Sequence, residues 1–146
     1  MNFDVHYCSE ERKESILRAL AVCLERYAEI SFAYAHGSFI AQGPFRDLDI
    51  ALYLYAEKVR DAGFRFEDRV AQDVGKTLNA PFPLDVRVMN EAPPAFQYHA
   101  IRGRLILERC SAHRIEVVCR IIQRYLDLKP ILDHHVREAF IDAVES

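Results

Sequence analysis

The sequence lacks any segment suited to crossing a membrane. No uninterrupted apolar run reaches the roughly 18 residues that a transmembrane helix requires. The N-terminal stretch MNFDVHYCSEERKE has neither the basic start nor the apolar middle of a secretory signal peptide. We therefore expect the protein to work in the cytoplasm.

Cysteines are few, and their spacing does not suggest that they act together. Cys8, Cys23, Cys110 and Cys119 form no C-x-x-C motif and no cysteine-histidine arrangement of the zinc-finger kind. The spacing argues against a disulfide framework and against a structural zinc site. We expect four reduced thiols, each in the core or at the surface.

An excess of positive charge is also missing. The chain has 19 lysines and arginines against 22 aspartates and glutamates, which gives a net charge of -3. Broad, charge-driven binding of nucleic acid is therefore disfavoured, and we expect no direct nucleic-acid partner. A set of arginines in the last third could steer ATP or an acidic partner, although mixed charge on a solvated face is commoner: Arg102, Arg104, Arg109, Arg114 and Arg120.

Repeats, low-complexity tracts and linkers are absent as well, and what remains has the composition of one folded domain. The 146 residues are 51% hydrophobic and 28% charged, a balance that can bury a core. We expect a single domain over residues 1–146, with a sheet and its helices up to about residue 92 and a mainly helical part from about 93 to 146.

Hydrophobic periodicity predicts the elements of the first part. Ser9 is a candidate N-cap for a helix that runs to about residue 28. Strands are expected at ISFAYAH (30–36), from Asp47 to residue 54, and at LDVRVM (84–89), with a helix over 64–79. The fold class is thus α/β (α+β), with a mixed sheet flanked by helices.

Helical spacing dominates the last third of the sequence. Pro93-Pro94 opens a short helix to about residue 102, and LILE (105–108) predicts an edge strand. A long helix follows from Ser111, ends at Pro130, and is succeeded by a final helix. The apolar stripes of these two helices are either core or a docking surface: Ile115, Val118, Ile122 and Leu126 or Tyr125 on the first, and Val136 and Phe140 on the second.

Acidic residues open one predicted strand and interrupt another. In a strand, Asp47 and Asp49 share one face with their α-carbons about 6.6 Å apart, because each residue rises about 3.3 Å. Asp85 lies on the polar face of the 84–89 strand and joins them if the two strands are neighbours. Three carboxylates this close raise one another's pKa unless a cation neutralises them.

Magnesium is the cation that these residues favour. Hard divalent ions prefer oxygen ligands, and two ions can clamp the attacking and departing oxygens of a phosphoryl transfer. Gly37-Ser38, at the end of the preceding strand, adds a turn where backbone amides and a hydroxyl can approach a phosphate. A polar strand start and an ordinary turn glycine remain the plain alternatives for each piece taken alone.

The order of these pieces resembles the DNA polymerase β-like nucleotidyltransferases. The pattern is Gly37-Ser38 at a strand end, Asp47-x-Asp49 on the next strand, and Asp85 on a later one. The stretch LDVRVMNEAPPAFQYHAIRGRLILER and the helix ending RYLDLKPILDHHVREA are similar to the minimal nucleotidyltransferase (MNT) antitoxins of that group. Such antitoxins are encoded beside an all-helical HEPN ribonuclease toxin.

The resemblance implies an enzyme that transfers AMP from ATP to a tyrosine of the toxin and so neutralises it. Asp47, Asp49 and Asp85 would hold two Mg²⁺ ions, and Asp85 would also take the proton of the tyrosine hydroxyl. Gly37 and Ser38 would contact the triphosphate. Arg46 stands where the family often has a small residue, and its guanidinium could assist the leaving pyrophosphate or face water.

Several alternatives remain open from the sequence. The acceptor could be a small hydroxyl compound, as in aminoglycoside nucleotidyltransferases, although the chain is short for a drug pocket. The protein could instead be a module that binds the toxin and retains only a vestigial site. The ribonuclease signature itself, an arginine and a histidine with four to six residues between them, is absent, because Arg109 and His113 are too close. His134-His135 is expected to be a surface pair rather than a metal site.

Overall fold

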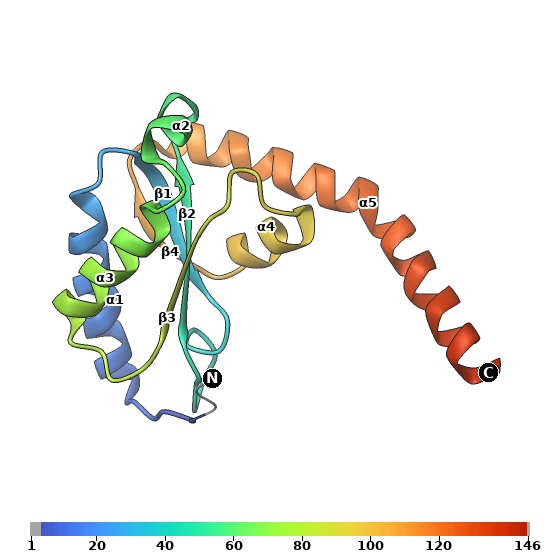
Figure 1. The fold of residues 1–146 in the computed structure, drawn as a ribbon, viewed down its shortest axis with the longest axis horizontal. Coiled ribbons are helices and arrows are strands. Elements are labelled where there is room, and N and C mark those ends of the chain that lie inside the picture. The colour runs from blue at the N-terminus through green and yellow to red at the C-terminus, as the bar shows by residue number, and fades with distance from the viewer. Residues whose placement is uncertain (1–3, 146) are drawn as a thin grey trace.

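The computed structural model describes residues 4–145, which form a sheet between two groups of helices (Figure 1). Exposure of side chains is described to residue 143. In chain order the elements are α1 (Glu10–Glu25), β1 (Ile30–His36), β2 (Leu48–Leu54), the 3-10 turn η1 (Ala56–Lys58), α2 (Val59–Ala62), α3 (Phe66–Leu78), β3 (Leu84–Val88), α4 (Pro94–Ile101), β4 (Arg104–Glu108) and α5 (Ser111–Glu145).

The sheet is mixed, as its sequence predicts. Its strand order is β3-β2-β1-β4, with β1 antiparallel to both β2 and β4, while β2 and β3 run parallel. The predicted edge position of the LILE strand is confirmed. Every predicted helix and strand up to residue 108 is present, and only η1 and α2 were not expected.

One face of the sheet packs against α1 and α3. Alternate residues of β2 point to this side, and Ile50, Leu52 and Leu54 are buried there with Leu20 and Val70 of the two helices. The N-cap of α1 is also confirmed, since the Ser9 side chain accepts a hydrogen bond from the amide of Arg12. This layer forms the larger part of the core and holds the strands in register.

The opposite face packs against α4 and the first half of α5 (Figure 1). Phe32, Tyr34 and Ala51 of the strands meet Ala100 of α4 and Val117 of α5 in a second, smaller buried cluster. The two helices are fastened to each other by stacked tyrosine rings, Tyr98 and Tyr125, whose centroids lie 4.0 Å apart. Both acidic motifs lie on this face of the sheet, so α4 forms part of their surroundings.

The prediction that a helix ends at Pro130 is wrong. α5 continues without interruption to Glu145 with Pro130 inside it, and Figure 1 shows the helix changing direction part-way along its length. A proline removes one hydrogen bond of the helix and bends it, and an exposed helix tolerates that bend because no packed neighbour opposes it.

The apolar residues of α5 divide between the core and the surface. The core contacts are made by Val117 and Ile121, whereas Ile115, Ile122 and Leu126 are exposed. Beyond the body of the protein the helix extends as an arm, and Val136 and Phe140 are each 69% exposed on it. The sequence left open whether these stripes are core or surface, and the structure places most of them at the surface.

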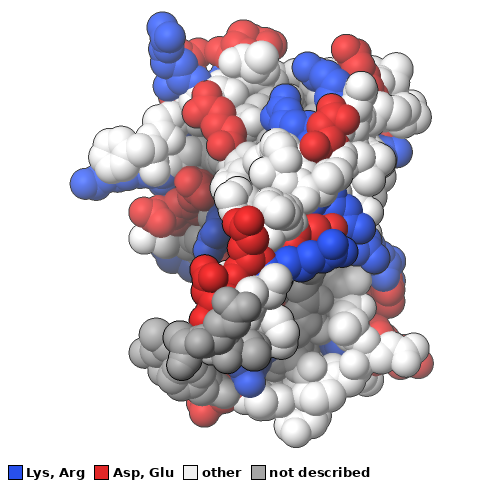
Figure 2. All heavy atoms as spheres, turned by 90° about the vertical axis from the view of Figure 1, so that its right-hand side faces the viewer, with Lys and Arg blue, Asp and Glu red and all other residues white. Residues whose placement is uncertain are grey.

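The surface shows mixed charge. On the face in Figure 2, acidic and basic side chains are interspersed, and neither sign forms a continuous field. Cys110 and Cys119 are exposed, Cys8 is half-buried, Cys23 is buried, and all four are free thiols as expected. In the described part of the chain, none of the helices combines the length and apolar character needed to span a membrane.

Candidate active site

Three polar side chains lie in one row across three neighbouring strands. The register pairs His36 of β1 with Asp49 of β2, and Asp49 with Asp85 of β3. Directly paired residues project from the same side of a sheet. The condition set by the sequence, that the Asp49 and Asp85 strands be neighbours, is therefore met.

Asp49 is the central residue of this row and is half-buried. Burial, and then the nearby Asp47 and Asp85 carboxylates, raise its pKa from 3.8 to about 6. Gly37 presses against this carboxylate, because a Cβ added at Gly37 would overlap Asp49 Oδ2. Gly37 also has a φ of 80°, which glycine adopts without strain. The glycine of the G-S pair thus allows the turn to lie directly on the acid.

The turn between β1 and β2 brings Gly37-Ser38 to the two aspartates. Asp47 immediately precedes β2 and is half-buried, and Arg46 beside it is exposed. The Arg46 amide donates a hydrogen bond of 3.2 Å to Ser38 Oγ, which leaves the serine hydroxyl hydrogen available to another acceptor. The hydrogen bond described for Arg46 is therefore made by its backbone. Its guanidinium makes none to the described residues of the site.

Asp85 is held by a basic neighbour on its own strand. Arg87 Nε lies 3.3 Å from Asp85 Oδ1, and both side chains are substantially exposed. Within residues 4–145, no three ligating side chains are grouped closely enough to surround an ion. The donor set nevertheless fits a hard divalent cation, since it offers only carboxylate oxygens, and burial together with the repulsion among them raises the pKa of Asp49.

A buried lysine that the sequence analysis did not single out fixes the loop between Gly37-Ser38 and Asp47. Lys13 of α1 is 3% exposed, and its ammonium donates hydrogen bonds to the carbonyl oxygens of Ala41 (2.9 Å) and Gly43 (3.0 Å). The same group lies over the rings of Phe39 and Phe45. Its position in the apolar stripe of α1 was the available signal, because lysine is rarely buried without a partner.

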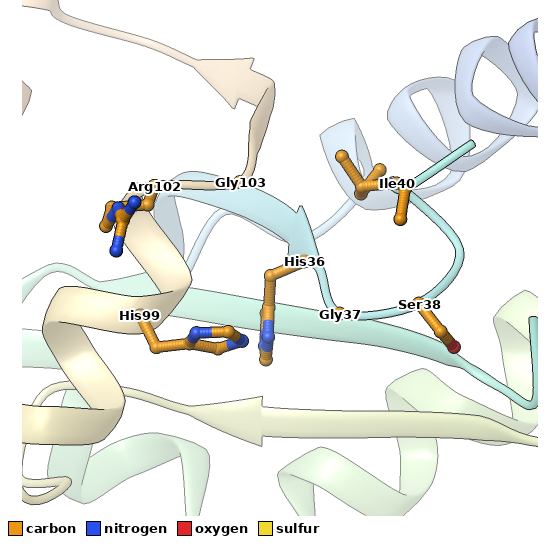
Figure 3. Close-up of a pocket in the computed structure, with 8 residues that line it drawn as sticks. His36, Gly37, Ser38, Ile40, His99, Arg102 and Gly103 are labelled. Atoms are coloured by element: carbon orange, nitrogen blue, oxygen red, sulfur yellow. The ribbon is translucent and has the colours of Figure 1, made fainter.

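A cavity of about 450 Å³ opens beside the row of His36, Asp49 and Asp85. One wall consists of His36, Gly37 and Ser38, and the other consists of His99, Arg102 and Gly103 from the end of α4 and the turn that follows (Figure 3). Periodicity could not reveal this neighbourhood, because α4 reaches β1 only through the tertiary fold.

Two histidines line this cavity, and one of them, His36, is registered with Asp49. The rings of His36 and His99 meet edge to face with centroids 5.4 Å apart (Figure 3). Burial, and then the neighbouring His99, lower the pKa of His36 to about 4. His36 is therefore neutral near pH 7, and its buried Nδ1 has no hydrogen-bond partner among the described residues.

Comparison with known proteins decides the family. A family model described as polymerase beta, nucleotidyltransferase matches residues 19–112, which include every strand and both acidic motifs. The chain belongs to this nucleotidyltransferase family. No curated protein matches the sequence.

The fold of this nucleotidyltransferase is similar to several solved structures. The toxin–antitoxin MntA–HepT structure matches with a TM-score of 0.59 at 16% identity, covering 94% of this chain and 100% of the other. The structure of the tri-AMPylated Shewanella oneidensis HEPN toxin with its MNT antitoxin gives 0.59 at 17% identity, with 94% and 98% covered. A toxin–antitoxin structure with AMP-PNP gives 0.57 at 16% identity, with 95% and 100% covered. At these identities the likeness concerns the fold.

Proposed function

We propose that this nucleotidyltransferase is the MNT antitoxin of a HEPN toxin and transfers AMP from ATP to a tyrosine hydroxyl of that toxin in the cytoplasm. The observation that carries the proposal is the row in which Asp49 and Asp85 are registered on neighbouring strands, with Gly37 pressed against Asp49. Family membership supports the reaction class, and the similar solved structures include an MNT antitoxin with a tri-AMPylated HEPN toxin.

In this proposal Asp47 and the two acids of the row bind metal, and Asp85 also orients the acceptor. Asp47 and Asp49 would hold two Mg²⁺ ions with Asp85 as the third ligand, and the bound ions would neutralise charge on the phosphates. Asp85 leaves Arg87 and accepts the proton of the tyrosine hydroxyl. Its partial exposure supports this role, because a protein acceptor has to reach it.

Gly37 and Ser38 are proposed to bind the triphosphate. The positive φ of Gly37 turns the backbone after β1, and the Ser38 hydroxyl retains a hydrogen to donate. ATP is favoured as the substrate by the similar structure that contains AMP-PNP. For Arg46, its exposed side chain agrees better with a position in water than with a contact to pyrophosphate.

A labelling experiment tests the proposal. The purified protein is mixed with the product of the adjacent gene, Mg²⁺ and ATP labelled at the α-phosphate. We expect label on the toxin, loss of that label in Asp47→Asn and Asp49→Asn, and full labelling by the matched control Asp127→Asn, whose carboxylate lies on exposed α5. Addition of EDTA tests the requirement for a divalent ion.

Two outcomes would replace the proposal. Full neutralisation of the toxin by Asp47→Asn and Asp49→Asn, without label at any time, would indicate an antitoxin that acts by binding alone. Label on an aminoglycoside but not on the toxin would indicate a small-molecule enzyme. Peptide mapping that finds AMP on a residue other than tyrosine would refute the stated acceptor.

A further inference from the structure

The order of the row His36, Asp49 and Asp85 indicates the side of the site on which the leaving group departs. In an in-line displacement the attacking and leaving oxygens lie on opposite sides of the phosphorus. In the proposed function, on which this inference rests, the acceptor enters beside Asp85. The row runs Asp85, Asp49, His36 across the sheet, so the leaving group departs on the His36 side, where the 450 Å³ cavity lies.

This cavity differs in charge from the row beside it. Among the residues that the structure describes, no carboxylate lines this cavity, and Arg102 is the one lining residue with a permanent charge. Across the described residues 4–145, no acid lies within ion-pair distance of Arg102, whose guanidinium lies over the Tyr98 ring at 5.6 Å. By contrast, Arg104 is paired with Glu14, and Arg114 with Glu108. Arg102 is thus a cation available to an anionic ligand.

Gly103 brings the backbone next to Arg102 against the end of β1, just before the G-S turn. A Cβ at Gly103 would overlap the carbonyl oxygen of Ala35 and lie 2.9 Å from His36 Cβ. The chain can therefore pass from α4 into β4 directly against the end of β1. The unpartnered Nδ1 of His36 is a second polar group at the cavity, in the wall that also holds Gly37 and Ser38.

We propose that Arg102 is a ligand of the β- and γ-phosphates of the nucleotide, and that the His99–Arg102 turn of α4 forms the wall of the pyrophosphate site opposite Gly37-Ser38. During transfer the acceptor oxygen forms a bond to the α-phosphorus and its proton goes to Asp85. The bond from the α-phosphorus to the bridging oxygen breaks, and its electron pair leaves with pyrophosphate toward Arg102. The guanidinium, rather than the exposed Arg46, compensates that charge.

Binding measurements with Mg²⁺ test this assignment without relying on turnover. The probes are AMP-PNP, inorganic tripolyphosphate and AMP, and the variants are Arg102→Gln, Arg102→Lys, Arg46→Gln and Arg120→Gln. Loss of one charge-assisted contact weakens binding about 10-fold to 100-fold. We expect this loss in Arg102→Gln for AMP-PNP and tripolyphosphate, little change for AMP, partial retention in Arg102→Lys, and wild-type binding in Arg120→Gln, an exposed arginine of α5 outside the cavity.

The outcomes separate this inference from the proposed function. Wild-type affinity of Arg102→Gln for AMP-PNP, or a loss that falls equally on AMP, overturns the role of Arg102 and leaves AMP transfer intact. A stronger effect of Arg46→Gln than of Arg102→Gln overturns it as well. Selective loss of tripolyphosphate in Arg102→Gln supports it, even where no acceptor is labelled and the proposed function fails. Absence of any binding of AMP-PNP to the wild type overturns both.

Discussion

Asp49→Asn is expected to make the metal-free protein more stable at neutral pH. The carboxyl has a pKa of about 6 in the folded chain, against an ordinary value of 3.8. Ionising this carboxyl is therefore about 3 kcal/mol less favourable in the folded chain than in the unfolded chain, because each pKa unit corresponds to about 1.36 kcal/mol. Asp49 is only half-buried, so solvent screening reduces the expected gain to about 1–2 kcal/mol.

The sign of the pH dependence follows from proton binding. Between about pH 4 and pH 6 the folded state holds the Asp49 proton while the unfolded state has released it. The free energy of unfolding of the wild type therefore falls across this window, and asparagine removes that fall. The advantage of Asp49→Asn is absent at pH 4 and complete above pH 7.

Urea unfolding followed by circular dichroism, in EDTA at pH 4, 6 and 8, measures this difference. Asp127→Asn on exposed α5 is the matched control and should follow the wild type at each pH. An Asp49→Asn protein that is no more stable than the wild type at pH 8, or that gains equally at pH 4, would refute the reasoning. Adding Mg²⁺ should stabilise the wild type and not Asp49→Asn, because the proposed ligand is lost.

Three further predictions concern the elements that support the site. Lys13→Met should lower the free energy of unfolding by about 2 kcal/mol, because the carbonyls of Ala41 and Gly43 lose a charged hydrogen-bond donor. The loop over residues 39–45 should then become sensitive to protease, and unchanged cleavage would contradict this reasoning. Gly103→Ala should destabilise by about 2–3 kcal/mol in thermal unfolding, whereas Gly75→Ala, with ordinary space for a methyl group, should stabilise by about 0.5–1 kcal/mol; equal effects would be inconsistent with the packing described. A chain ending after Lys129 should keep its melting temperature within about 2 °C, since surface changes that remove no buried contact are small, and a large drop would show that the arm is part of the fold.

Local pattern was sufficient for the sheet and for the faces of its strands. Alternation in 47–54 and 84–89 separated apolar from polar positions correctly, because a strand with a buried face cannot shift by one residue without reversing its pattern. The same alternation placed Asp49 and Asp85 on polar faces. It could not show that their strands pair in register, which depends on a crossover through α3.

Local pattern failed in α5. The predicted stop at Pro130 rests on the loss of one backbone hydrogen bond, but a proline bends an exposed helix without ending it when the flanking turns continue. Local pattern also left open which apolar residues of α5 are covered, because the exposed Ile115 and Ile122, seven residues apart, fit helical spacing as well as the buried Val117 and Ile121, four residues apart. Spacing defines a face of the helix, and only the position of α4 and the sheet decides which face is covered.

The sequence by itself determined the order of the four strands and the two chemical motifs, the G-S turn and the aspartates, because these depend on neighbours a few residues away. Only the tertiary structure decided that His36, Asp49 and Asp85 form one row, that Lys13 holds the intervening loop, and that His99 and Arg102 face Gly37 and Ser38 across a cavity. These contacts join residues far apart in the chain, and they arise from strand register and helix packing, which no local spacing records.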